Sequence, residues 1–394
     1  MVRGTRALEG LEMTEPEMTQ LFDSYYAGRR VFVTGHTGFK GSWLTQWLLL
    51  LGAEVTGYSI GVPTQPSLYE PLGLSGQIQD VRGDVRRSQD VQTAMAKAAP
   101  EVVIHMAAQA LVLPSYADPL TTFETNVMGT ANVLEAARHC PSVRSVVIVT
   151  TDKCYANNEW PYGYRDADAL GGHDPYSASK AAAEMVVASY RSSFFDAGNA
   201  SGKRTGVASV RSGNVIGGGD WAADRLVPDC IRALAEGHPI IVRNPGSVRP
   251  WQHVLEPLSG YLWLGALLAR DPATYGGAWN FGPNPESAVS VEQVVSQVCQ
   301  VWGGAARFET ATSAQALSEA GILRLDCTKA RSQLGWHPVY DMGEAVHQTV
   351  TWYRSTMEDA GRAVPLTVRN ISDYVQAARA KGVSWAPMDR GGRV

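Results

Sequence analysis

From Arg30 onward, short apolar strands alternate regularly with amphipathic helices. The expected strands are RRVFVTG, AEVTGYSI, GQIQDVRGDV, EVVIHMAA, RSVVIVTT and GVASVRSGNV. Between them, apolar residues recur near helical spacing. Strands that alternate with helices assemble into a parallel sheet with helices on both faces. We therefore expect an α/β protein with a Rossmann-type doubly wound parallel sheet.

The pattern changes after Val215, where loops rich in Gly, Trp, Pro and Arg alternate with short helices. We expect this part to form a smaller C-terminal substrate-binding domain against the carboxyl ends of the strands, where ligands bind in such folds. Four segments are expected: an N-terminal extension (1–27), the Rossmann domain (28–215), a mainly substrate-binding domain (216–365) and a C-terminal extension (366–394).

Composition and charge exclude several classes of protein. The formal net charge of −4 predicts no broad basic surface for nucleic acid. The apolar run WLLLLGAEV is too short to span a membrane, which takes about 20 residues. The five cysteines show neither CxxC pairing nor Cys/His metal spacing. We therefore expect a cytoplasmic protein with no metal site.

A glycine-rich turn follows the first expected strand. The stretch VFVTGHTGFKGSWL places Gly35, Gly38 and Gly41 between that strand and a helix, with Phe39 inside the turn. The first glycine permits the tight turn, the second lets the backbone approach a pyrophosphate, and the third allows close helix packing. The helix N-terminus then faces the phosphate charge. The turn predicts a dinucleotide site, although a tight turn without a ligand has the same local pattern.

Two later segments fit the same dinucleotide. Asp84 and Val85 follow the third expected strand, where the Asp84 carboxylate is placed to accept from an adenine amino group. In HMAAQA, the small residues Ala107 and Ala108, followed by Gln109, leave room for a dinucleotide that lies on the sheet. We expect these five residues to contact the cofactor.

The loop after the second expected strand does not decide between NAD and NADP. An Asp or Glu about 20 residues beyond the glycines marks NAD, and an Arg accommodates the 2′-phosphate of NADP. The loop GYSIGVPTQPS offers Tyr58 and Ser59 instead, and Ser59 is expected at the ribose. NAD is the expected cofactor, and NADP is the alternative.

The stretch PYSASKAAAE places Tyr176 and Lys180 on one face of an expected helix. A tyrosine, whose ordinary pKa is about 10, acts as a base at neutral pH only where a nearby cation favours its phenolate. Lys180 is placed to supply that charge. The pair alone is common, but after a dinucleotide turn it predicts a catalytic site.

Together, TGHTGFKG, TTDKCY and PYSASK resemble the extended short-chain dehydrogenase/reductases and, within them, the sugar-nucleotide 4,6-dehydratases. Longer stretches, such as TDKCYANNEWPYGYRDADALGGHDPYSASK and RSGNVIGGGDWAADRLVPD, are most similar to the group that acts on CDP-glucose. The similarity covers nearly everything from Tyr25 to Tyr353.

The resemblance implies a reaction and a role for each residue. Tyr176, tuned by Lys180, would take the proton of the sugar 4-hydroxyl while C4 gives up a hydride, and Thr151 would hydrogen-bond the same oxygen. The new 4-keto group acidifies the C5 hydrogen, and Asp152, if protonated, would release the 6-hydroxyl as water. Return of the hydride to C6 would give CDP-4-keto-6-deoxyglucose with the cofactor still bound.

Lys153 stands where most related dehydratases that act on other nucleotides have Glu. As a neutral amine it would take the C5 proton, and as an ammonium it would stabilise the C5 enolate while another base acts. The sequence leaves both roles open. The plain alternative is that Asp152 and Lys153 form a solvated pair in a loop.

The same resemblance implies a nucleotide-sugar pocket lined by RSGNVIGGGDW and SVRPWQHV. Asn214 and Arg249 are the leading candidates for the sugar and the diphosphate, and Arg225 is a second candidate for the diphosphate. His253 is expected to be a structural histidine.

Two other functions and the oligomeric state stay open. A nucleotide-sugar 4-epimerase would use Tyr176 without needing the Asp–Lys pair. A non-catalytic dinucleotide-binding regulator would be expected to have lost Tyr176 or Lys180. The apolar helices TFETNVMGTANVLEAARH and YSASKAAAEMVVASYRSSFF resemble the pair that forms a four-helix bundle in dimers of the family, so a homodimer is expected.

Overall fold

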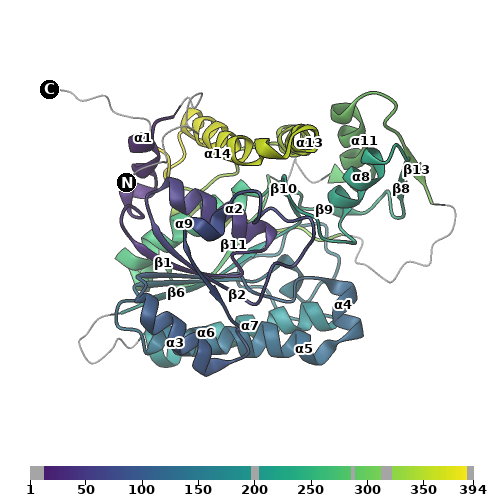
Figure 1. Ribbon diagram of the computed structural model, residues 1–394. Helices are drawn as coiled ribbons and strands as arrows, with labels where there is room; N and C mark the ends of the chain where they lie inside the picture. The colour runs from purple at the N-terminus through teal and green to yellow at the C-terminus, as the bar shows by residue number, and fades with distance from the viewer. Residues whose placement is uncertain (1–12, 197–203, 285–288, 312–321, 388–394) are drawn as a thin grey trace.

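The computed structural model describes residues 13–196, 204–284, 289–311 and 322–387. At its centre is a seven-stranded parallel sheet in the order β11-β6-β5-β4-β1-β2-β3 (Figure 1). The strands are β1 (Arg30–Thr34), β2 (Glu54–Ser59), β3 (Gln79–Arg82), β4 (Val102–His105), β5 (Ser145–Val149), β6 (Gly206–Ser212) and β11 (Gly277–Phe281). All six expected strands form, and the Rossmann-type doubly wound fold is confirmed.

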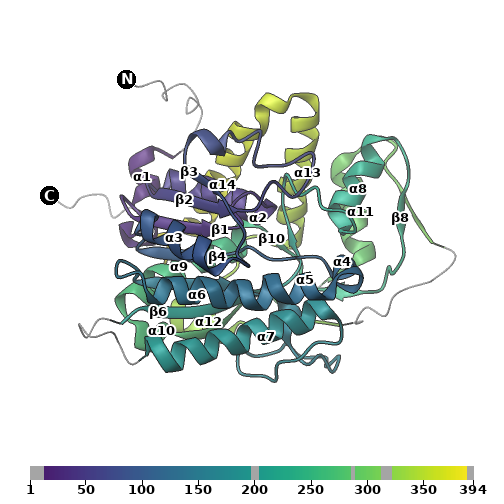
Figure 2. The same ribbon diagram turned by 60° about the horizontal axis from the view of Figure 1, so that its bottom comes forward.

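Helices cover both faces of this sheet, as Figures 1 and 2 show. One layer contains α3 (Ser88–Ala98), α4 (Val112–Ala117), α5 (Pro119–Phe123), α6 (Gly129–Arg138) and α7 (Pro175–Tyr190). The other contains α2 (Phe39–Leu50), α9 (Leu255–Arg270), α13 (Met342–Glu358) and α14 (Ala363–Ala380). Because both faces are covered, strands β4, β5 and β6 are buried along their whole length, which explains the apolar runs of β4 and β5.

Helix α2 is mostly apolar and largely enclosed. It packs on β2 and is itself covered by α9 and α14. Trp43 and Trp47 are fully buried within it. Phe22, from the N-terminal extension, stacks on Trp385, from the C-terminal extension, and Trp47 meets both rings edge-on. The two extensions therefore close the outer side of α2, the helix that starts at the glycine-rich turn.

A smaller lobe stands beside the carboxyl ends of the strands (Figure 1). It contains α8 (Leu226–Ala235), β8 (Ile240–Val242), α11 (Val291–Trp302) and β13 (Phe308–Thr310). Short pairs join it to the sheet domain: β7 (Val215–Ile216) with β10 (Gln252–His253), and β9 (Val248–Arg249) with β12 (Val289–Ser290). However, β11 and α9 return to the main sheet, so the 216–365 segment contributes to both bodies. The domain ranges stay a prediction.

The remaining elements are short. They include α1 (Glu15–Thr19), α10 (Pro272–Tyr275) and α12 (Thr328–Leu334). The expected helix TFETNVMGTANVLEAARH is made of α5, a π-helical turn over Glu124–Met128, and α6. Residues 1–12 of the N-terminal extension and 388–394 of the C-terminal extension lie outside the described residues. Within the described ranges, no helix has the length and hydropathy that crossing a membrane requires.

Candidate active site

The glycine-rich turn lies at the point where the strand order reverses, between β1 and β4. Gly35 has φ +75°, and a Cβ there would lie 2.7 Å from the backbone nitrogen of Ala107. A Cβ on Gly41 would lie 2.1 Å from the Gly35 carbonyl oxygen. Gly38 is the N-cap of α2 and contributes no capping side chain, so the first amides of α2 are available to an anion. The turn fits a pyrophosphate, and partly buried Phe39 begins the helix beside it.

The loop after β4 is held from two sides. Thr34 accepts hydrogen bonds from the backbone amides of Met106 and Ala107, both at 3.1 Å. Ala107 and Ala108 are partly buried, which leaves the surface above them open to a flat ligand. The Gln109 side-chain amide donates to the Leu111 carbonyl at 2.9 Å and to the Thr122 hydroxyl on α5 at 3.0 Å. The side-chain amide of Gln109 is therefore used to hold the conformation of this loop and is not free to bind a ligand.

Asn126 is a site residue that the sequence did not single out. Its side chain accepts from the Gln109 amide at 2.9 Å and donates to the Ser179 hydroxyl on α7 at 2.9 Å. Asn126 thus ties the loop after β4 to α7, the helix that contains Tyr176 and Lys180. In the sequence, Asn126 stands out only as a polar residue within an apolar helix. That is weak evidence for a place in the site.

Ser59, the expected ribose residue, is linked through His36 to a carboxylate on β3. The Ser59 hydroxyl is hydrogen-bonded to Nδ1 of buried His36 at 2.9 Å, and His36 Nε2 lies 2.9 Å from Asp80 Oδ1. Asp80, on β3, also accepts from Tyr69 at 2.7 Å and from Arg82 at 2.7 Å. A carboxylate on β3 therefore lies behind Ser59, and its oxygens are engaged by His36, Tyr69 and Arg82.

Asp84 and Val85 follow β3, as expected. Arg86 donates to both Asp84 oxygens, at 2.9 and 3.1 Å, and its hydrogen bonds hold the pKa of that carboxyl below its usual range. Val85 is buried, and its carbonyl accepts from the Asn132 side chain at 2.9 Å. The carboxylate stays ionised at the rim of the crevice, where it remains a candidate for the adenine amino group.

Thr151, Asp152 and Lys153 come together in a short turn at the end of β5. Thr151 Oγ1 donates to Asp152 Oδ1 at 3.1 Å and accepts from the Lys153 amide at 3.3 Å. Asp152 is 2% exposed, and its Oδ2 has no hydrogen-bond partner among the described residues. Burial raises the pKa of Asp152, against the opposing charges of Lys153 and Arg249. Burial thus shifts this carboxyl group toward its protonated form, and one of its oxygens is left without a hydrogen-bond partner among the described residues.

Tyr176 and Lys180 lie in the first turns of α7, which starts at the N-cap Asp174 and Pro175. Burial raises the pKa of Tyr176 to about 12, although Thr151 opposes this by hydrogen bonding. The Lys180 ammonium donates to the Val149 carbonyl at 3.2 Å, and burial lowers its pKa to about 8. Without ligands, the chain keeps Tyr176 protonated. A bound positive charge beside the phenol would be needed to make it a base at neutral pH.

Two of the three predicted substrate residues lie near Tyr176 or Asp152. Arg225 pairs with Asp220 at 3.0 Å, and its charge acts on Tyr176. Arg249 is 7% exposed and lies close enough to Asp152 to oppose the rise of its pKa. Asn214 follows β6, and its carbonyl accepts from the Gln252 amide. Both arginines thus lie near the catalytic side chains, and their contacts with a substrate stay a prediction.

Behind these side chains lies a buried ion pair that the sequence analysis missed. Glu184, one turn after Lys180 on α7, accepts from Thr150 at 2.5 Å, Ser209 at 2.6 Å and Arg211 at 2.8 Å. Arg211 also donates to the Tyr155 hydroxyl at 2.7 Å. Both ends of the TTDKCY loop are therefore anchored to one ion pair. The sequence shows a glutamate four residues after Lys180, in AAAE. It does not show which residues pair with that glutamate.

Lys40 is a second residue that the sequence analysis passed over. It lies in the first turn of α2, and its ammonium donates to the Ser212 hydroxyl and to the Tyr261 hydroxyl, both at 3.1 Å. The signal was present in the sequence as a basic residue inside the glycine-rich turn GHTGFKG. The orientation of its side chain depends on Ser212 in β6 and Tyr261 in α9, which are distant from α2 in the sequence.

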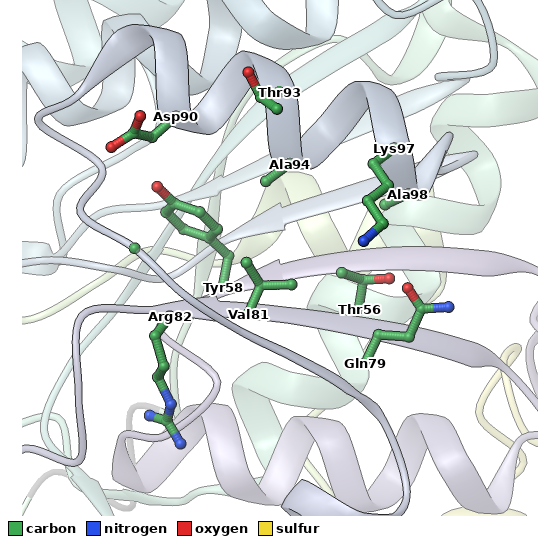
Figure 3. A pocket seen from close by; sticks show the side chains of 11 residues that line it. Thr56, Tyr58, Gln79, Val81, Arg82, Asp90, Thr93, Ala94, Lys97 and Ala98 are labelled. Atoms are coloured by element: carbon green, nitrogen blue, oxygen red, sulfur yellow. The ribbon is translucent and has the colours of Figure 1, made fainter.

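A cavity of about 330 Å³ lies apart from these residues, between helix α3 and strands β2 and β3, at one end of the sheet (Figure 3). Tyr58 and Asp90 line one end, and Gln79 and Lys97 line the other. The catalytic side chains follow β5 and begin α7, on the other side of β1 and β4. This cavity is therefore separate from the candidate active site.

His253 is buried, as its interpretation as a structural histidine requires. Its ring meets Trp43 and Tyr340 edge-on, with centroids 6.0 and 5.7 Å away. Burial lowers its pKa to about 3. The ring is therefore neutral in the folded protein at neutral pH and packs as an aromatic group.

His253→Phe is expected to make the protein less sensitive to acid. Because the folded pKa of about 3 lies below the unfolded value of 6.5, the unfolded chain binds more protons between these limits. Stability from this residue is therefore lost as the pH falls through that window, by about 1.4 kcal/mol per pH unit. Urea unfolding at about pH 7 and about pH 5 should show that the free energy of unfolding falls less in the variant than in the wild-type protein. An equal loss in both proteins would contradict this prediction.

Comparison with known proteins identifies the relatives of this chain. Residues 32–349 match the family model described as GDP-mannose 4,6 dehydratase. CDP-glucose 4,6-dehydratase of Salmonella typhimurium is 46% identical over 354 residues, which cover 90% of this chain and 98% of that protein. The structure of UDP-glucose 4-epimerase of Thermus thermophilus in complex with NAD is 26% identical, with a TM-score of 0.68, over 82% of this chain and 99% of that one.

Proposed function

Because the chain belongs to the GDP-mannose 4,6-dehydratase family, we propose that it removes water from a nucleotide sugar and that its substrate is CDP-glucose. The chain is then a hydro-lyase, and the expected product is CDP-4-keto-6-deoxyglucose. One observation carries the proposal: the buried, partly unpartnered Asp152 carboxyl beside Lys153 and Tyr176. An epimerase has no need of an acid at this position.

NAD is the cofactor that the proposal requires. The Gly35–Gly41 turn and the uncapped start of α2 fit its pyrophosphate, and the relative from Thermus thermophilus binds NAD. When bound, NAD would accept a hydride from the substrate and later return it. Its nicotinamide is also positively charged in the oxidised form, which is the charge that Tyr176 needs nearby to act as a base.

The protein side chains divide the remaining work. Tyr176 takes the proton of the 4-hydroxyl, while Thr151 holds the same oxygen and thereby orients the sugar. Asp152 then gives its proton to the departing 6-hydroxyl, which leaves as water. Lys153 acts at C5, either as a neutral base or as a cation that stabilises the enolate. Arg225 and Arg249 are the proposed ligands of the substrate diphosphate.

Incubation of the purified protein with CDP-, dTDP-, UDP- and GDP-glucose tests the function. We expect mass spectrometry to show the loss of one water from CDP-glucose and slower or no change in the other three. A product that keeps its mass would favour an epimerase. Absence of any product, with dinucleotide binding intact, would favour a non-catalytic regulator.

We also propose that the enzyme is a homodimer. Leu120 on α5 is 76% exposed, Met185 on α7 is 57% exposed, and Phe194 beyond α7 is 44% exposed. Figure 2 shows α5 and α7 together on the outer layer of the molecule, and the two helices are in contact. Two such helices from each subunit would form a four-helix bundle. Sedimentation velocity should show a dimer that Met185→Glu weakens, and a monomeric wild-type protein would refute the proposal.

A cytoplasmic location completes the proposal. The five cysteines are free, and four of them are buried. Free thiols persist in reducing compartments. Recovery of the enzyme in a cell-envelope fraction would contradict this location.

A further inference from the structure

Arg225, a proposed ligand of the substrate diphosphate, is held by one carboxylate. Its Nη1 donates to Asp220 Oδ2 at 3.0 Å, and this is the one hydrogen bond that the guanidinium makes among the described residues. The Asp220 side chain is buried, whereas the Arg225 side chain is partly exposed. A guanidinium has five N–H donors in a fixed plane, so four of them are left for a ligand.

The Asp220 carboxylate holds both ends of the turn that precedes α8. Its Oδ1 accepts from the backbone amide of Ala222 at 3.1 Å, while its Oδ2 binds Arg225, the N-cap of α8. Between these contacts, Asp224 has φ +60°, a left-handed conformation that few residues other than glycine adopt. Such conformations persist where the surrounding structure enforces them. Both oxygens of Asp220 thus contribute to the shape of the turn that carries Arg225.

Helix α13 holds Asp220 in place. The Tyr353 hydroxyl donates to the backbone carbonyl of Asp220 at 2.5 Å, and the Tyr353 ring meets the Trp221 ring edge-on, with centroids 5.2 Å apart. Two residues before Asp220, Gly218 lies against Trp352, where a Cβ would be 2.1 Å from the nearest ring atom. The carboxylate therefore stands on a segment that is packed against a helix, and this is the kind of support that keeps a binding side chain in one geometry.

We propose that Asp220 is a positioning residue that orients Arg225 toward the substrate diphosphate. Recognition of phosphate by arginine depends on the direction of the guanidinium plane, because its donors form a rigid fork. Asp220 sets this direction before the substrate arrives, which reduces the entropy cost of ordering a long side chain on binding. The inference rests on the proposed function, in which Arg225 is a diphosphate ligand, and names the residue that acts through Arg225.

Two other roles for the carboxylate predict different results. If Asp220 competes with the diphosphate for Arg225, removal of its charge would tighten nucleotide binding. If Asp220 only stabilises the turn, its removal would weaken binding whether or not Arg225 is present. The free donors of Arg225 favour positioning over competition, because a phosphate can bind them while the carboxylate stays in place.

A double-mutant cycle on the binding of CDP separates these roles. Isothermal titration measures the dissociation constant of CDP for the wild-type, Asp220→Asn, Arg225→Met and doubly substituted proteins. Titration with NAD checks that each variant is folded. Asparagine keeps the size of the side chain but accepts hydrogen bonds through only one atom. Asp229→Asn, at an exposed aspartate that pairs with Arg232 on α8, is the matched control.

Asp220→Glu is a second variant that keeps the negative charge and moves the carboxylate by one methylene group. If position matters, this variant should also bind CDP more weakly than the wild-type protein. Wild-type affinity in Asp220→Glu would show that the charge alone is enough, and this result would contradict a positioning role.

We expect Asp220→Asn to weaken CDP binding by about tenfold when Arg225 is present, which corresponds to about 1.4 kcal/mol. In the Arg225→Met background the same substitution should change binding by less than about twofold. With CDP-glucose, Asp220→Asn should raise KM by a similar factor and leave kcat nearly unchanged, because the diphosphate is held equally in the ground state and the transition state. Asp229→Asn should bind CDP as the wild-type protein does.

Tighter or unchanged CDP binding in Asp220→Asn, or an equal loss in both backgrounds, would overturn the inference and leave the proposed function in place. Unchanged CDP binding in Arg225→Met would overturn the inference together with the proposed role of Arg225. Failure of the wild-type protein to bind CDP, with NAD binding intact, would overturn the proposed substrate as well.

Discussion

Lys153→Ala is expected to oxidise CDP-glucose at C4 but to stall before water is lost. In a single turnover, reduced cofactor should form at close to the wild-type rate, because Tyr176 and Thr151 are the residues proposed for that step. Formation of the keto-deoxy product should slow by about 10²–10⁴-fold, the range typical of a lost acid or base. Stopped-flow absorbance of the reduced nicotinamide and mass spectrometry of the product measure the two steps separately.

Lys153→Arg distinguishes the two roles that the lysine could have. Arginine keeps the positive charge but does not give up its proton in proteins. If Lys153 is the base, the arginine variant should fail as the alanine variant does, whereas a stabilising cation should be partly replaced by arginine. Lys97→Ala, at an exposed position on α3, is the control and should leave both steps unchanged. A Lys153→Ala enzyme that forms no reduced cofactor would refute this division of work.

Arg211→Met is expected to lower the free energy of unfolding by about 3–5 kcal/mol, the usual cost of removing one partner from a buried ion pair. Arg211 and Glu184 are each 3% exposed, so the glutamate would be left buried without its counter-charge. The Tyr155 hydroxyl and the Asp166 carbonyl would also lose a donor. Urea unfolding followed by circular dichroism measures the change.

Two further variants show whether the loss comes from the unpaired charge. Arg165→Met removes an exposed arginine from its pair with Asp168 and should cost less than about 1 kcal/mol, as surface pairs do. Glu184→Leu combined with Arg211→Met removes both charges and should recover part of the loss, because no buried ion remains. A single Arg211→Met variant as stable as Arg165→Met would show that the pair contributes little.

Motifs within one turn or one helix face were predictable from the sequence. Gly35 and Gly41 follow a strand at a spacing that only a tight turn before a helix needs, and the structure shows why a Cβ has no room at either position. Tyr176 and Lys180 share a helix face because four residues make about one turn. In each case the residues that act together are close in the chain, so their spacing in the sequence predicts their relative positions in the structure.

Other site residues depend on partners that are distant in the chain. Asp80, on β3, is linked to Ser59 through His36, and nothing in the sequence indicates that these three residues lie together. Glu184 meets Arg211 only because α7 packs on β6. No local spacing predicts such contacts, since they depend on strand order and helix packing.

By itself, the sequence determined the α/β class, the glycine-rich turn and the candidates for the reactive side chains, because periodicity and motif spacing are local properties of the chain. Only the tertiary structure decided which charged side chains lie close to one another. The carboxyl ends of parallel strands converge at one edge once the sheet order is set, and this brings the Lys40 ammonium near Asp152 and Lys180. Burial at that edge then raises the pKa of Asp152 and lowers that of Lys180. Desolvation depends on everything packed around a group, so it is a property of the fold.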